Sequence, residues 1–144
     1  MLVKIKKLNE NAIIPSYGTQ FSAGADLYNL GDEVVIAPHT TVLIHTGIAL
    51  EIPEGYGGFI YARSGLASKR GLAPANKVGV IDADYRGEIM VALHNHSDIE
   101  AKVDAYERVA QLVIAPFLKA EFELCDDLSD TVRGAGGFGS TGTK

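Results

Sequence analysis

Arginines in this sequence stand beside glycines, an arrangement that suits the binding of an anion. Glycine lets the backbone approach an anion closely, and its N–H groups can point at the bound oxygens. A neighbouring guanidinium supplies a bidentate cationic fork that matches phosphate. The alternative is that each Arg-Gly pair is ordinary turn chemistry. Four segments carry the pattern: Arg63-Ser64-Gly65, Arg70-Gly71, Arg86-Gly87 and Arg133-Gly134. With the hydroxyls of Ser64, Ser140 and Thr141, they predict a site for a small phosphate-bearing ligand.

A second candidate for chemistry is Asp82-Ala83-Asp84-Tyr85-Arg86-Gly87, which joins the apolar runs 78–81 and 88–93. We predict a β-hairpin whose tip carries two acids, an aromatic ring and an arginine. An aspartate at such a tip, beside a bound nucleotide, can act as general base for a water molecule. The alternative is an aspartate that caps a turn through its own backbone. Asp26, in the segment 23–27, has the same two interpretations, and a solvated turn is the simpler one.

The C-terminal segment 133–144 contains five glycines and one aromatic residue, Phe138. It cannot build a core alone. It can fold over a ligand as a lid, with the Phe138 ring stacked on a planar group and hydroxyls and amides on phosphate. The alternative is a disordered C-terminus, against which Phe138 counts because disordered tails are poor in aromatic residues.

His94-Asn95-His96 places two imidazoles at i and i+2, on one face of a predicted strand. Such a pair can be half of a metal site. No cysteine, histidine or acid cluster lies near it in the sequence, so exposed histidines at a strand end are the preferred interpretation. His39 and His45 look isolated.

Short β-branched runs, punctuated by glycine and proline, must position these residues. The pattern predicts a sandwich, barrel or jelly roll. The segment Ser64 to Arg70 is different because helix formers follow a Ser-Gly start, and it predicts one short helix. Strands are expected near residues 3–6, 34–36, 41–45, 47–52, 57–61, 88–93 and 109–114.

Length and composition limit the classes of protein. A chain of 144 residues and 15.3 kDa is the size of one domain. The net charge of −5 argues against bulk binding of nucleic acid, and no stretch approaches the ~18 apolar residues of a membrane span. One cysteine, Cys125, cannot form an internal disulfide, and no secretory signal is visible. We therefore expect a cytoplasmic, reducing setting without a membrane partner.

Read in order, five segments strongly resemble the motifs of the trimeric dUTPase family, the deoxyuridine 5′-triphosphate nucleotidohydrolases. They cover nearly the whole chain, and a chance match of all five in order is very improbable. The segments are Ser22-Ala23-Gly24-Ala25-Asp26-Leu27; Ala62-Arg63-Ser64-Gly65-Leu66-Ala67; the run from Asn76 to Gly87; Glu107-Arg108-Val109-Ala110-Gln111-Leu112; and the run from Arg133 to Gly142.

The resemblance implies a single all-β domain, 1–144, with a jelly-roll-like distorted β-barrel and one short helix. The barrel body would span about 1–116 and the C-terminal arm about 117–144, with a glycine-rich lid at 133–142. The arm would be exchanged in a homotrimer whose active sites are shared between subunits. This would explain a tail that looks unable to fold alone, since its ordering cost is met by substrate and neighbour.

The implied reaction is Mg²⁺-dependent hydrolysis of dUTP to dUMP and pyrophosphate, which keeps uracil out of DNA and supplies dUMP for thymidylate synthesis. By resemblance, Asp82 orients and deprotonates the water that attacks the α-phosphorus. Tyr85 packs under the deoxyribose and excludes a 2′-hydroxyl. The base edge would meet the backbone around Val80, Ile81 and Met90 and the Asn76 side chain, which reject cytosine by leaving polar groups unpaired.

The remaining roles implied by resemblance concern the phosphates. Ser64 and Gly65, with Arg63, match the phosphate-binding loop, and Gln111 matches a residue on phosphate and the attacking water. Arg133 matches an arm arginine that stabilises developing charge. Phe138 would stack on uracil, and Gly139, Ser140 and Thr141 would hold the γ-phosphate. Mg²⁺ would sit on phosphates and water with no direct protein ligand, with Asp26 holding its water shell or nearby arginines.

Two positions depart from the family pattern. Ala62 stands where proline is usual, and Asp104-Ala105-Tyr106-Glu107 replaces a glycine-containing turn. One alternative function is dCTP deamination on the same fold, which needs a glutamate where this chain has Arg86. Another is a non-catalytic nucleotide-sensing or partner-binding module, which would not need Asp82, Arg133 and Phe138 together.

Overall fold

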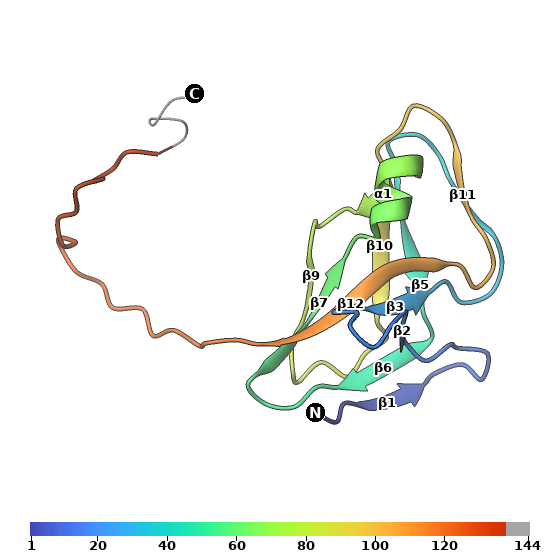
Figure 1. Cartoon of the computed structure of the whole chain (residues 1–144), viewed down its shortest axis with the longest axis horizontal. Helices are drawn as coiled ribbons and strands as arrows, with labels where there is room; N and C mark the ends of the chain where they lie inside the picture. Colours follow the sequence, from blue (N-terminus) through green and yellow to red (C-terminus); the bar gives the residue numbers. More distant parts are fainter. Residues whose placement is uncertain (138–144) are drawn as a thin grey trace.

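The computed structural model describes residues 1–137 of the chain, and its folded part is built almost wholly from β-strands (Figure 1). The elements are β1 (Lys4–Lys7), β2 (Ser16–Tyr17), β3 (Ala25–Tyr28), β4 (Val34–Ile36), β5 (Thr41–His45), β6 (Ile48–Glu51), β7 (Tyr56–Tyr61), α1 (Ser64–Arg70), β8 (Leu72–Pro74), β9 (Gly79–Ile81), β10 (Met90–Asn95), β11 (Ala101–Val103) and β12 (Arg108–Pro116).

Among residues 1–137, all strand pairs are antiparallel. The largest sheet has the order β2-β3-β12-β7-β9, and a second has the order β5-β10-β8. Two short pairs, β1-β6 and β11-β4, complete the body. Most neighbours in the two larger sheets are distant in sequence, which is the hallmark of a jelly-roll-like arrangement. The predicted all-β fold with one short helix is confirmed.

Alternation of side chains along the strands builds the core. In β10, Val91 and Leu93 are buried while Met90 and Ala92 point to the opposite, more exposed face. This period of two is what a sheet with one packed face requires. The fully buried side chains include Leu27, Ile36, Ile44, Ile48, Leu72, Ile89, Leu93, Val103 and Val109.

Helix α1 begins and ends where the sequence predicts. Arg63, the residue before it, is extended, and Gly71, the residue after it, adopts a left-handed conformation with φ of 65°. Glycine is favoured there because it has no Cβ to clash, and Lys69 and Arg70 in the last turn suit the negative end of the helix dipole. The helix therefore delivers Ser64 and Gly65 at its first turn.

The predicted hairpin over Asp82–Gly87 is wrong. β9 pairs with β7, with Ile81 opposite Gly58, and β10 pairs with β5 and β8. The intervening segment crosses from one sheet to the other instead of turning back along β9. Sequence adjacency suggested the pairing, whereas burial of Ile81 against β7 decides it. The segment still joins the two strands and carries the predicted side chains.

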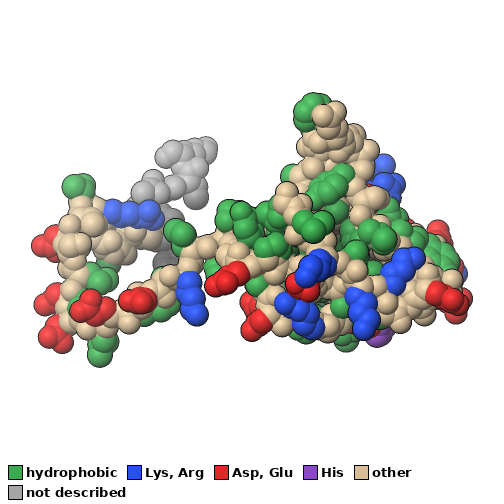
Figure 2. Space-filling view, turned by 90° about the horizontal axis from the view of Figure 1, so that it is seen from below, with side chains coloured by type: hydrophobic (Ala, Val, Ile, Leu, Met, Phe, Trp, Pro, Cys, Tyr) green, Lys and Arg blue, Asp and Glu red, His purple; other side chains and the backbone are tan. Residues whose placement is uncertain are grey.

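Residues 117–137 form no helix or strand and run away from the body (Figure 1). Leu118, Phe122 and Leu124 are each at least 97% exposed. In the space-filling view this segment stands clear, with hydrophobic and acidic side chains both in the open (Figure 2). Monomeric proteins rarely expose several large apolar side chains in one segment, whereas surfaces that bind another protein chain often do.

Candidate active site

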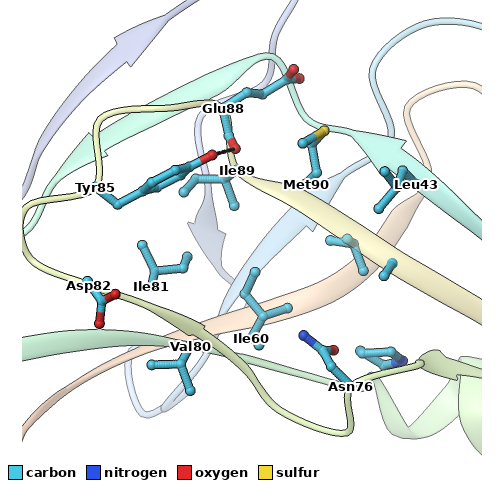
Figure 3. A pocket seen from close by; sticks show the side chains of 14 residues that line it. Leu43, Ile60, Asn76, Val80, Ile81, Asp82, Tyr85, Glu88, Ile89 and Met90 are labelled. Carbon is cyan, nitrogen blue, oxygen red and sulfur yellow. Dashed lines mark hydrogen bonds between the residues drawn. The ribbon is translucent and has the colours of Figure 1, made fainter.

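One pocket, of about 320 Å³, gathers six of the residues predicted to bind a nucleotide (Figure 3). They come from β9, β10 and the segments beside β9. Asp82 and Tyr85 lie toward one end of the pocket and Asn76 toward the other. We call this the base pocket. The predicted residues that line it are Asn76, Val80, Ile81, Asp82, Tyr85 and Met90.

Backbone and side-chain hydrogen bonds hold the segment that carries Asp82 and Tyr85. The Tyr85 N–H donates to the Asp82 carbonyl at 3.1 Å. Arg86 Nη1 donates to the Ala83 carbonyl at 2.6 Å and the Tyr85 carbonyl at 3.0 Å. Tyr85 Oη donates to the Glu88 carbonyl at 2.9 Å, as Figure 3 shows. The aromatic ring and the backbone that carries Asp82 are thus held by contacts within one short segment.

Glu88 at the rim of this pocket contacts the end of β5 and the residue Gly47 beyond it. Its carboxylate accepts from the Gly47 N–H at 2.8 Å and lies 2.9 Å from His45 Nδ1. Burial alone would raise the pKa of Glu88, but the hydrogen bonds from His45 and Gly47 outweigh it, so the pKa lies below the ordinary 4.5. His45, which the sequence left isolated, therefore has a carboxylate partner.

A second pocket, of about 360 Å³, gathers the phosphate-binding candidates. Arg63, Ser64 and Gly65 enter it from the start of α1, and Gln111 enters from β12. Gln111 Nε2 donates to the Ala62 carbonyl at 2.8 Å, which fixes its amide. We call this the anion pocket.

Asp26 lies in β3 and not in a solvated turn, so the simpler interpretation of this residue is wrong. Its side chain is only 14% exposed. Oδ1 accepts from Arg63 Nε at 2.8 Å, and Oδ2 accepts from Arg108 Nη1 at 3.2 Å. One carboxylate therefore aims two guanidiniums at the anion pocket. Arg108 was missed as a site residue because it alone among the arginines has no glycine nearby.

The structure separates the two halves of the predicted site. The base pocket and the anion pocket share no lining residue. In the five-stranded sheet β12 and β7 lie between β3 and β9, which puts β3 and β9 about 14 Å apart at ordinary strand spacing. Asp82 and Gln111 thus belong to different pockets of one chain.

The four Arg-Gly segments differ in what they do. Only the one at Arg63 lines the anion pocket. Arg70 forms an ion pair with Glu107 at 2.5 Å while Gly71 ends the helix, and Arg86 braces backbone carbonyls. The alternative of ordinary turn chemistry is therefore right for these two.

The arm residues predicted to act lie apart from both pockets or outside the described residues. Arg133 is exposed and donates from Nε to the Gly136 carbonyl at 2.7 Å, forming a local turn. Phe138, Gly139, Ser140 and Thr141 fall outside the described residues, so their predicted roles stay predictions.

The His94 and His96 rings meet edge to face, with centroids 4.4 Å apart. Burial, followed by the charges of His94, Lys77 and His39, holds the pKa of His96 below its ordinary 6.5. Within residues 1–137, no three His, Cys, Asp or Glu side chains are grouped so that they could hold a metal ion. In the same part of the chain, no helix has the length and apolar character to cross a membrane.

Comparison with known proteins gives one consistent result. The family model dUTPase matches residues 10–142. Deoxyuridine 5′-triphosphate nucleotidohydrolase from Hydrogenobaculum sp. (strain Y04AAS1) is 51% identical over 144 residues, covering 100% of both chains. The enzyme of the same name from Nautilia profundicola is 54% identical over 142 residues, covering 99% of both.

Solved structures agree with the sequence relatives. The dUTPase of Staphylococcus bacteriophage 80alpha with dUpNHpp has a TM-score of 0.89 and 30% identity, covering 99% of both chains. A mutant dUTPase from phage phi11 of S. aureus, described as revealing the coordination of a structural Mg(II) ion, has a TM-score of 0.78 and 27% identity, covering 88% of this chain and 98% of its own. With the model match over most of its length and relatives near half identity, this chain belongs to the dUTPase family.

Proposed function

We propose that this chain is a dUTP diphosphatase, which hydrolyses dUTP to dUMP and pyrophosphate through attack of water on the α-phosphorus. The observation that carries the proposal is the base pocket, where Asp82 lies beside Tyr85 at one end of an apolar cavity in a member of the dUTPase family. The consequence for the cell is removal of a uracil precursor from the DNA supply and production of dUMP for thymidylate synthesis.

The base pocket has the chemistry to select uracil. Ile60, Ile81 and Ile89 supply an apolar floor, and Asn76 supplies one amide group. The backbone at Val80, Ile81 and Met90 offers fixed donors and acceptors to the base edge. A base with the wrong edge would leave such groups unpaired, at a cost that direct contacts cannot recover. Tyr85 would lie under the deoxyribose and exclude the 2′-hydroxyl.

Catalysis would be mostly positioning and neutralisation of charge. Asp82 would orient the attacking water and accept its proton, as an exposed carboxylate at the pocket rim can do. Arg63, with Ser64, Gly65 and Gln111, would bind the phosphates, and Arg133 would stabilise the charge that develops on them.

Mg²⁺ is the proposed cofactor, and it would neutralise part of the triphosphate charge when bound. Small hard cations prefer phosphate, carboxylate and water oxygens. Asp26 fits a role at its water shell because the two arginines take one position on each carboxylate oxygen, and a carboxylate offers about four.

We also propose a homotrimer in which the base pocket of one subunit meets the anion pocket of another. Two observations support it. Within one chain the two pockets share no lining residue, and Asp82 and Gln111 line different ones. In the arm, the apolar residues Leu118, Phe122 and Leu124 alternate with polar residues, and their side chains are exposed to solvent. This pattern is expected of a strand that pairs with another copy of the chain.

In this arrangement residues 1–116 form the body and residues 117–144 form the arm, with 133–142 closing over a neighbouring site. Phe138 would stack on uracil, and Gly139, Ser140 and Thr141 would hold the γ-phosphate. We place the enzyme in the cytoplasm, where the free, exposed thiol of Cys125 would remain reduced.

The test is a nucleotide panel with purified protein and Mg²⁺. Pyrophosphate should be released from dUTP far faster than from dTTP, dCTP or UTP. Release of ammonia from dCTP would instead identify a deaminase, and binding of dUTP without turnover would identify a non-catalytic module.

A second test separates binding from chemistry. Asp82→Asn should bind a non-hydrolysable dUTP analogue as the wild type does but lose turnover by orders of magnitude. Asp84→Asn, two residues away on the same segment, is the matched control and should keep turnover. Normal turnover by Asp82→Asn would refute the assignment of the general base.

A further inference from the structure

Gly87 stands where any side chain would collide with Tyr85. A Cβ at position 87 would collide with Tyr85 Oη and would lie 2.6 Å from Cζ and 2.9 Å from Cε2. Real carbon contacts are not this short, since carbon atoms pack at about 3.5–4.0 Å. The φ of Gly87 lies outside the left-handed region, so its backbone is one that alanine can adopt. The glycine is therefore needed for the space it leaves and not for its conformation.

The ring is the part that would give way, since Tyr85 is 43% exposed and its ring can swing toward solvent. Its hydroxyl donates to the Glu88 carbonyl at 2.9 Å, so the far end of the side chain is tethered. Its own N–H bonds to the Asp82 carbonyl, and the guanidinium of Arg86 bonds to the Ala83 and Tyr85 carbonyls. A methyl group at position 87 must therefore push the ring out of its place, breaking the hydroxyl contact.

We propose that Gly87 is a positioning residue that sets selectivity for 2′-deoxyribose, because the missing side chain lets the Tyr85 ring lie flat against the backbone at the floor of the sugar site. The inference rests on the proposed function. It adds that the exclusion of a 2′-hydroxyl depends on Gly87 as much as on the ring that contacts the sugar.

The experiment compares Gly87→Ala with the wild type on dUTP and UTP, with kcat and KM measured for each. We expect the ratio of kcat/KM for dUTP to that for UTP to fall at least tenfold, because a displaced ring no longer blocks the 2′-hydroxyl. An unchanged ratio would overturn the proposal. Failure of the proposed function is a different result, since there the wild type itself would not prefer dUTP.

Gly24→Ala is the matched control at the anion pocket. A Cβ at position 24 would lie 2.5 Å from Gln111 Oε1 and 3.0 Å from Gln111 Cβ, so the crowding is similar but acts on a phosphate-binding side chain. This variant should lower kcat/KM for both nucleotides by a similar factor and leave their ratio within twofold. A fall in the ratio as large as that of Gly87→Ala would show that general crowding, and not the ring, is responsible.

A double-mutant cycle keeps the test informative if Gly87→Ala is poorly folded. Tyr85→Ala removes all three atoms that the new methyl group would meet. In the Tyr85→Ala background, Gly87→Ala should change the ratio of kcat/KM for dUTP to that for UTP by less than twofold. It should also leave the melting temperature unchanged, because the effect of the methyl group acts through the ring. An equal loss in both backgrounds would assign Gly87 a purely structural role and refute the proposal.

Discussion

Asp26 is the residue whose loss should be felt in both stability and catalysis. Asp26→Asn keeps the size of the side chain but replaces one carboxylate oxygen with an amide that donates. Arg63 and Arg108 then face each other without a countercharge, and one of them meets a donor instead of an acceptor. The variant therefore isolates the charge of Asp26 from its volume.

The magnitude follows from how exposed each partner is. The side chains of Arg63 and Asp26 are 26% and 14% exposed, so the bond between them is only partly screened, and such bonds contribute about 1.5–3 kcal/mol. Arg108 is 50% exposed, and its bond contributes about 0.5 kcal/mol. Because asparagine retains one acceptor, we expect a net loss of about 2 kcal/mol, or about 6 °C in Tm for a chain of this size.

Urea and thermal unfolding at fixed protein concentration measure this loss, since the stability of an oligomer depends on concentration. Asp32→Asn, an exposed aspartate with no side-chain partner among residues 1–137, is the matched control and should change stability by less than about 0.5 kcal/mol. The same Asp26→Asn protein should lose at least tenfold in kcat/KM for dUTP as Arg63 drifts. Stability equal to that of the wild type would refute the claim that Asp26 holds the arginines.

Glu88→Gln should destabilise by about 1 kcal/mol at neutral pH. The pKa of Glu88 is lowered in the folded protein, so its contribution to stability is present above pH 4.5 and is lost as the pH falls through the folded pKa. The free energies of unfolding of wild type and Glu88→Gln should therefore become equal at low pH. A difference that stays constant with pH would contradict this prediction. Tyr106→Asn should stabilise by about 0.5 kcal/mol in urea titrations because Tyr106 has φ of 57°, where asparagine is tolerated, and a loss of stability would count against strain at this turn. Removal of residues 133–144 should leave a folded oligomer by sedimentation with little dUTP turnover, whereas an unfolded product would make this segment structural.

Local features of the sequence predicted the elements well. The β-branched run in β12 ends at Pro116, and the helix formers after Ser64 end at Gly71, so both limits depend on residues inside or next to the element. Four short strands, β2, β3, β8 and β11, were not predicted, because two to four residues give little periodicity of their own. Pairing with a neighbour, which no local pattern records, makes them strands.

Residue patterns alone could not show which candidates share a pocket, because motifs give residues but not distances; only the family resemblance implied that the site is divided between subunits. Asp26 and Arg108 are far apart in the sequence, and only the pairing of β3 with β12 brings them together. The irregularity between Arg108 and Ala110 shifts the register at that point. Placement of the charges thus depends on strand register, which is set by burial along the whole sheet.

Several glycines leave room for a side chain of the protein itself. The sequence pattern suggested other roles for glycine, beside arginines at an anion site, between strands and in a lid. A Cβ at Gly58 or Gly79 would lie 3.2 Å from the Cβ of Ile81 or Ile60, across the β7-β9 pair. Gly87 likewise leaves room for the ring of Tyr85, which a Cβ at position 87 would meet. An apolar or aromatic partner opposite a glycine whose φ is ordinary therefore indicates close packing. Between β7 and β9, this packing favours the observed pairing over the expected hairpin. At Gly87, it positions the Tyr85 ring on which selection of the sugar would depend.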